Sequence, residues 1–145
     1  MTPHQIRLVR ASWSAVERIG APAAALFYAR LFELDPALRA LFKGDLGTQG
    51  DRLLTMIKAA VDGLERLDRL LPVVHALGQR HGGYGVRGAH YATVGTALLW
   101  TLERGLGAAF STDVREAWTA VYGTLAAAMQ DGARSDHAAP LAEAA

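Results

Sequence analysis

The sequence predicts an all-α domain, and three of its features support this fold class. Apolar side chains recur every three or four residues along most of the chain, as they do on one face of a helix. No β-branched run of strand length interrupts that pattern. Glycine and proline separate the periodic segments, where they end one helix and begin the next. About seven helices are therefore expected, in one domain over residues 1–131 that is followed by a flexible tail over 132–145.

The first three helices are marked by the residues at their ends. Thr2 and Gln5 have the spacing of a capping box, with a proline between them, so the first helix begins there. Gly20 ends that helix, and a second helix follows with Tyr28 among its apolar positions. Asp35 and the proline after it then open a short third helix, ALRALF.

The later helices follow the same pattern. Thr48 is expected to cap a long helix whose apolar face begins with Gln49 and Leu53. Another helix is expected over Leu71–Gly82, and it leads into a turn rich in glycine. The two last helices carry apolar faces through Tyr91, Val94, Leu98 and Leu102 and through Val114, Trp118, Val121 and Leu125.

The composition excludes several classes of function. The formal net charge is +1, so no strong field for nucleic acid or an acidic membrane is expected. The chain has no cysteine, which excludes disulfides, thiolate catalysis and thiolate metal sites. The N-terminus lacks a signal-peptide pattern, and no segment reaches the ~18 apolar residues of a membrane span. These features favour a cytoplasmic protein with no nucleic-acid or membrane partner.

The segment HGGYGVRG, residues 81–88, contains the GxGxxG pattern of dinucleotide-binding loops. Such a loop follows a buried strand and opens a helix. Here the preceding apolar residues Val74 and Leu77 and then His81 have helical spacing. We therefore interpret the glycines as the end of a helix and a turn, and His81 needs its own explanation.

Two histidines lie on this predicted helix. His75 and His81 point about 120° apart, at about 100° per residue, so they cannot both face one ligand. No second histidine or carboxylate stands at a metal-pair spacing, which argues against a metal site made by protein groups alone. Two interpretations of His81 remain open at this point. It is a half-buried side chain bonded to a carbonyl, or it ligates the iron of a haem that supplies the other four donors.

Three further residues allow similar alternatives. Gln49 is either a boundary residue or a polar group that points into an apolar pocket. Tyr28 fits a core, but its hydroxyl needs a partner when it is buried. Phe42 is a loop-edge aromatic residue that simple packing also explains.

Taken together, these residues resemble the globin family, over about residues 5–131. The likeness is to bacterial single-domain haemoglobins, the haem domain of flavohaemoglobins and neuroglobin. The H-x-x-x-G-V pattern at 81–86 with HYxxVG at 90–95 is specific. The resemblance implies a three-over-three helical sandwich with a short connection between its third and fifth helices. The strings that carry it are SW at 12–13, LFYARLFELDPALRALF at 26–42, LGQRHGGYGVRGAHYATVGTALLWTLERGLGAAF at 77–110 and AWTAVYGTLAAAM at 117–129.

The resemblance also implies a role for each site residue. His81 would be the proximal ligand of the iron of haem b, iron protoporphyrin IX. Tyr28 and Gln49 would be the distal hydrogen-bond donors that act on the gas ligand. The residues expected to pack on the haem are Phe42, Leu53, Leu77, Val86, Tyr91 and Val94.

The function that this resemblance implies is reversible binding of dioxygen, and also of carbon monoxide and nitric oxide. The alternative is nitric oxide dioxygenation, which would use a separate reductase. The protein is expected to be a monomer or a homodimer. Flavohaemoglobins have a glutamate in the last helix that bonds the proximal groups, whereas this sequence has Ala133 there and only Asp131 nearby. Strong anionic activation of His81 is therefore not expected.

Overall fold

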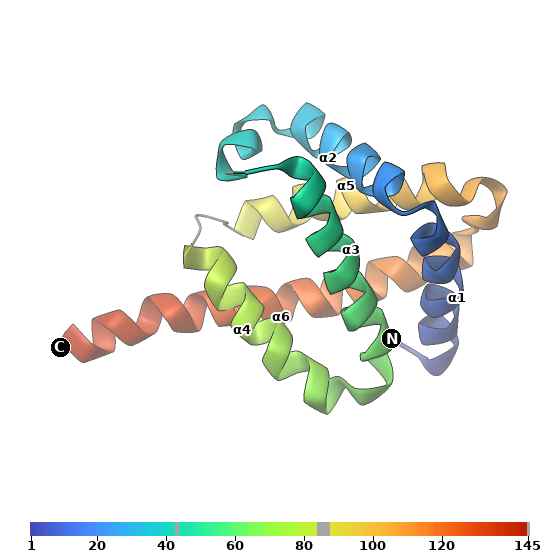
Figure 1. The fold of residues 1–145 in the computed structure, drawn as a ribbon. Helices are drawn as coiled ribbons and strands as arrows, with labels where there is room; N and C mark the ends of the chain where they lie inside the picture. The colour runs from blue at the N-terminus through green and yellow to red at the C-terminus, as the bar shows by residue number, and fades with distance from the viewer. Residues whose placement is uncertain (43, 84–87, 145) are drawn as a thin grey trace.

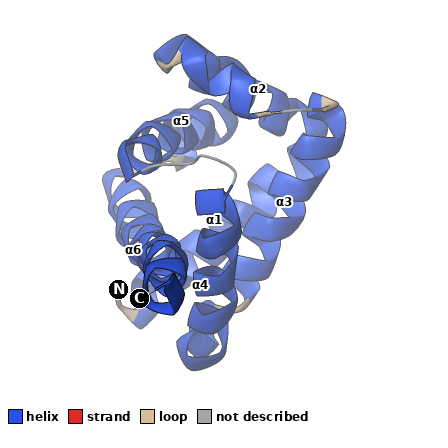
Figure 2. Ribbon diagram, turned by 90° about the vertical axis from the view of Figure 1, so that its left-hand side faces the viewer, coloured by secondary structure: helices blue, strands red, loops and turns tan. Residues whose placement is uncertain are grey.

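The computed structural model of the chain describes residues 1–42, 44–83 and 88–144, with the side chains of 1–42, 44–80 and 88–133. Every regular element in those segments is a helix (Figures 1 and 2). The all-α class predicted from the sequence is confirmed. The α-helices are α1 (Pro3–Ile19), α2 (Ala21–Leu34), α3 (Leu46–Asp62), α4 (Leu67–Gly83), α5 (Gly88–Leu106) and α6 (Thr112–Ala144). The 3-10 segments are η1 (Pro36–Leu41), η2 (Leu64–Arg66) and η3 (Gly107–Ala109).

The helix ends show which local signals in the sequence decided the fold. Thr2 caps α1 in the predicted capping box, in which its hydroxyl accepts from the Gln5 N–H at 3.1 Å. Gly20 ends α1 with a φ of 70°, a conformation that favours glycine. The predicted Thr48 cap is wrong. α3 begins one turn earlier, because the Asp45 carboxylate accepts hydrogen bonds from the Thr48 N–H, at 3.0 Å, and from the Thr48 hydroxyl.

Two other boundaries differ from the prediction. α4 begins at Leu67 rather than Leu71, because η2 leads directly into it and Pro72 lies inside the helix. Pro72 has no N–H to donate to the carbonyl of Asp68, and because both residues are exposed that carbonyl can face water. α6 continues through residues 132–144, which the sequence assigned to a tail. The flexibility of that segment stays a prediction.

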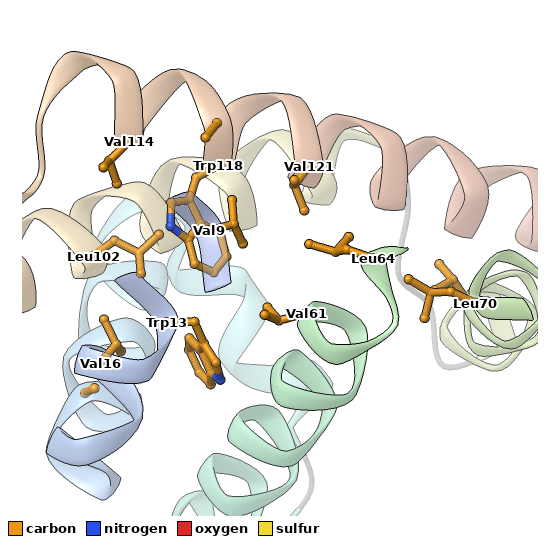
Figure 3. Close-up of a cluster of buried hydrophobic side chains, with 13 residues drawn as sticks. Val9, Trp13, Val16, Val61, Leu64, Leu70, Leu102, Val114, Trp118 and Val121 are labelled. Carbon is orange, nitrogen blue, oxygen red and sulfur yellow. The ribbon is translucent and has the colours of Figure 1, made fainter. Parts of the chain in front are cut away.

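The larger hydrophobic core joins α1 and α6 and also takes in side chains of α3, α4 and α5 (Figure 3). The indole rings of Trp13 and Trp118 meet edge to face, with centroids 6.3 Å apart. Trp118 Nε1 donates to Ser12 Oγ at 2.8 Å, and this serine hydroxyl in turn donates to the Leu8 carbonyl at 2.7 Å. The core therefore ties α1 to α6 by apolar burial and by a satisfied indole nitrogen.

Helix contacts divide the remaining elements into two groups. α4 packs mainly on α6, whereas α2 packs on α5 and α3 (Figure 1). The connection from η1 to α3 is short, as predicted, so no separate helix lies between them in the described residues. The expected site residues that the structure describes lie on α2, α3, α4 and α5 and, in the case of Phe42, directly after η1. Among the helices that the structure describes, none is both long and apolar enough to cross a bilayer.

Candidate functional site

A second buried cluster brings together four of the residues that the sequence assigned to a pocket. Tyr28 comes from α2, Phe42 from the end of η1, Leu53 from α3 and Val94 from α5. The buried members of the cluster are Phe27, Tyr28, Leu31, Leu38 and Ala97. The topology therefore gathers side chains that lie far apart in the sequence around one tyrosine.

Tyr28 is held in this cluster by aromatic contacts. Its ring meets Phe27 and Phe42 edge to face, at centroid distances of 5.2 and 5.4 Å, and stacks on Phe32 at 6.0 Å. Burial raises the pKa of the Tyr28 hydroxyl to about 12. The hydroxyl is therefore neutral at physiological pH and can donate a hydrogen bond.

The Tyr28 hydroxyl donates to the backbone carbonyl of Gln49 at 3.2 Å. This contact depends on a close approach of α2 and α3 at Gly50, where an added Cβ would lie 3.0 Å from the Ala24 Cβ. The Gln49 side chain is half-buried and was the predicted partner of the gas ligand. The structure thus brings Gln49 beside Tyr28, and the bond between them uses the Gln49 backbone.

Phe42 owes its position to the end of η1. Its backbone N–H donates to the Arg39 carbonyl at 3.2 Å, and the Arg39 guanidinium donates back to the Phe42 carbonyl at 3.0 Å. These two bonds fix the chain where it leaves the helix. The ring then packs against Phe32 at a centroid distance of 5.5 Å as well as against Tyr28.

Tyr91 lies on α5 and is 7% exposed. Its hydroxyl is buried and has no hydrogen-bond partner among the residues described. Its backbone carbonyl accepts from the Tyr122 hydroxyl at 2.7 Å, which joins α5 to α6. Burial raises the pKa of both tyrosines, and the charge of ionised Tyr91 would raise that of Tyr122 further. Both hydroxyls are therefore neutral donors.

The residues predicted for the proximal side are described less completely. His81 lies within α4, but its side chain is outside the described set, and Val86 lies outside it altogether. Leu77, one turn before His81, is half-buried, and so is His75. The GxGxxG turn also falls partly outside these residues, so its interpretation stays a prediction. Ala133, which the resemblance is expected to place at the flavohaemoglobin glutamate, is half-buried, and Asp131 is exposed.

The described side chains fit a large apolar cofactor better than a bare metal ion. No cluster of three or more His, Asp and Glu side chains within that set is arranged to hold a metal. By contrast, Phe42, Leu53, Leu77 and Val94 present half-buried apolar surface on three helices and one turn. The buried Tyr91 hydroxyl adds a donor that has no partner among the described residues. A group with an apolar face and polar atoms would cover this apolar surface and can accept a hydrogen bond from the Tyr91 hydroxyl.

Two aromatic residues of this region were not assigned to it from the sequence. Phe32 stacks on Tyr28, and its only signal was its position one helical turn after that tyrosine. Tyr122 fits against Gly95, where an added Cβ would lie 2.8 Å from the tyrosine ring. A glycine in the middle of an apolar helix was the available sign of that close contact.

Sequence comparisons agree on one family, and a comparison of structures finds the same fold. A model of the globin family matches residues 25–129. Neuroglobin of Danio rerio is 34% identical over 140 residues, which cover 86% of this chain and 87% of the relative. Neuroglobin-1 of Oncorhynchus mykiss is 32% identical over 146 residues, or 91% of this chain and 92% of the relative. A hexacoordinated haem protein from an anhydrobiotic tardigrade has the same fold, with a TM-score of 0.84 at 17% identity and coverage of 92% of this chain and 96% of that one.

Proposed function

The chain belongs to the globin family, and from this premise we propose that it is a haem b protein that reversibly binds dioxygen, and also carbon monoxide and nitric oxide. His81 is the proposed proximal ligand of the iron. Tyr28 and Gln49 are the proposed distal donors. The observation that carries the proposal is a neutral tyrosine hydroxyl held inside a buried aromatic cluster, next to the residue at the start of α3.

The proximal side needs a neutral imidazole on a helix. His81 continues the apolar face of α4 that includes Val74, which is buried. His75 occupies a position about 120° around the helix from that of His81 and is not the proposed ligand. When bound, haem iron held by one imidazole supplies a coordination position that is open to a diatomic gas.

The distal side supplies directed hydrogen bonds. The Tyr28 hydroxyl bonds a carbonyl that, within α3, also accepts from the helix ladder. The hydroxyl can therefore leave that carbonyl and donate to a polar gas, because the carbonyl keeps its bond in the helix. Gln49 can add an amide donor from a second helix. A hydrogen bond in this apolar setting favours a polar ligand over a less polar one such as carbon monoxide.

Phe42 and Phe32 give the Tyr28 hydroxyl an apolar surrounding. Their rings lie against the tyrosine ring at 5.4 and 6.0 Å and limit the access of water to it. A donor shielded from water makes a stronger electrostatic contact than the same donor in solvent. The cluster thus serves as the packing for the distal bond and as a barrier to water.

Nitric oxide dioxygenation with a separate reductase is the second candidate. The same observation favours it, since the Tyr28 donor that retains dioxygen would also hold it while nitric oxide arrives. Stopped-flow mixing of the oxygenated protein with nitric oxide, with and without an added reductase, separates turnover from a single oxidation. Sustained nitrate production with the reductase would favour the enzyme, and a single turnover would favour the binding protein.

The experiment that tests the haem assignment is a matched pair of histidine variants. We expect His81→Gly to lose most of the Soret absorbance of the purified protein and to regain it with added imidazole. His75→Gly, on the same helix, should keep the parent spectrum. A Soret band that survives in His81→Gly and disappears in His75→Gly would reverse the assignment, and a parent protein without any Soret band would refute haem binding.

A further inference from the structure

Helices α4 and α6 touch backbone to backbone at two glycines. A Cβ placed on Gly78 of α4 would overlap the backbone of Met129 of α6, at its carbonyl. A Cβ placed on Gly132 of α6 would overlap the carbonyl of His75 and lie 3.2 Å from the Gln79 nitrogen. Both glycines are buried. The contact is thus reciprocal, since each helix presents a glycine to the main chain of the other.

Space, rather than backbone conformation, requires glycine at these two positions. The glycines with positive φ in the described chain are Gly20 and Gly107, so Gly78 and Gly132 have ordinary helical dihedrals. A glycine inside a helix costs about 0.5–1 kcal/mol relative to alanine. Because the opposing atoms belong to the main chain, an added methyl group could not be accommodated by turning a side chain. Only a movement of one helix relative to the other would make room for it.

This contact bears on the proposed site because of what α4 carries. His81 follows Gly78 by three residues in the same helix, and α4 packs mainly on α6 (Figure 1). The distance between α4 and α6 therefore determines where the His81 backbone lies. α4 also contacts η2, at its N-terminal end and away from His81.

We propose that Gly78 and Gly132 are positioning residues for the proximal ligand, whose contact sets the distance of the His81 helix from α6. This inference rests on the proposed role of His81. Alanine at either position forces α4 away from α6 and moves the His81 backbone with it. The bond between His81 and the haem iron then changes in strength, although neither glycine is expected to touch the haem.

The test compares Gly78→Ala and Gly132→Ala with Gly123→Ala. Gly123 lies on α6 like Gly132, but a Cβ there would have no neighbour within 4 Å. We expect each of the first two variants to release haem to an excess acceptor on the order of 10-fold faster, in line with the cost of overpacking a rigid contact. The resonance Raman band of the iron–histidine stretch in the ferrous protein should shift. Gly123→Ala should leave both readouts at the parent values.

A second background separates positioning from general damage. In His81→Gly with added imidazole, the iron ligand is no longer attached to α4. Gly78→Ala in that background should leave the iron–imidazole band unchanged, whereas it shifts the iron–histidine band in the parent. A shift in both backgrounds would overturn the proposal, because the effect would then not pass through His81.

Two other outcomes would also count against the inference. Haem release and the Raman band could stay at parent values in both alanine variants. Alternatively, both variants could lack the far-ultraviolet circular dichroism of the haem-free parent, and the glycines would then be requirements of folding alone. Failure of the proposed function looks different, because His81→Gly would keep the parent Soret band whatever the glycine variants do.

Discussion

Removal of the Tyr28 hydroxyl gives the most direct test of the distal site. Tyr28→Phe keeps the ring contacts with Phe27, Phe32 and Phe42 and deletes only the bond to the Gln49 carbonyl at 3.2 Å. That carbonyl keeps its bond within the helix ladder of α3. The loss of stability in the haem-free protein should therefore be small, about 0.5–1 kcal/mol, because no buried acceptor is left unpaired.

The effect on dioxygen should be larger and specific. Before it can donate to the gas, the hydroxyl must leave the Gln49 carbonyl, so the net gain is the difference between two hydrogen bonds. We take this difference as about 1.4 kcal/mol, and Tyr28→Phe should then raise the dioxygen dissociation rate on the order of 10-fold. Carbon monoxide association should change much less, since access and not polarity limits that step.

Flash photolysis and stopped-flow displacement measure these rates. Tyr122→Phe is the matched control, because it also deletes one buried tyrosine hydroxyl, the one that donates to the Tyr91 carbonyl at 2.7 Å. That variant should lose stability but keep the dioxygen dissociation rate within twofold of the parent. The reasoning about the distal donor is wrong if Tyr28→Phe also stays within twofold, or if both variants accelerate dissociation equally.

Three further predictions follow from the same contacts. Gln49→Leu should also speed dioxygen dissociation in the same assay but change the urea-measured free energy of unfolding by less than about 0.5 kcal/mol, since Tyr28 bonds the backbone at this position. Burial raises the pKa of Tyr28 to about 12 from 10.0. The unfolded chain thus loses this proton first, and stability falls as pH rises between these values. Urea unfolding measures how much free energy of unfolding is lost between about pH 9 and about pH 11. This loss should be on the order of 1 kcal/mol smaller in Tyr28→Phe than in the parent, and equal losses would contradict the reasoning. Ser12→Ala leaves the Trp118 indole nitrogen without its 2.8 Å partner and should cost about 1–3 kcal/mol in urea unfolding, and no loss would show that the bond is unimportant.

The sequence predicted the helices well where a local signal marks an end. The capping box at Thr2 and the stop at Gly20 each depend on a few adjacent residues, and both are confirmed. The prediction that Thr48 caps α3 was wrong because two residues suited to capping, Asp45 and Thr48, stand three positions apart. Asp45 accepts from the Thr48 N–H there, and a carboxylate also suits the positive end of the helix dipole.

The site was predictable only in part. Helical spacing placed Tyr28 and Leu53 on apolar faces, and the resemblance to a family linked them before any contact was known. Spacing cannot show what a face meets, so the sequence alone does not identify Phe32 as the ring that stacks on Tyr28. The reason for a glycine within a helix, such as Gly78, lies in the neighbouring helix. The residues next to Gly78 in the sequence therefore do not reveal that reason.

The two sides of the proposed pocket are held by different kinds of contact. On the distal side, side chains pack on one another around Tyr28. The neutral hydrogen bond of its hydroxyl can change partner at a free-energy difference of about 1 kcal/mol. On the proximal side, α4 rests on α6 at Gly78 and Gly132 with no side chain between the main chains to absorb a change. Side chains can turn, whereas backbones in contact can only separate. Distal substitutions should therefore alter the rates of gas binding and leave the haem in place, whereas substitutions at the two glycines should alter how firmly the haem is held.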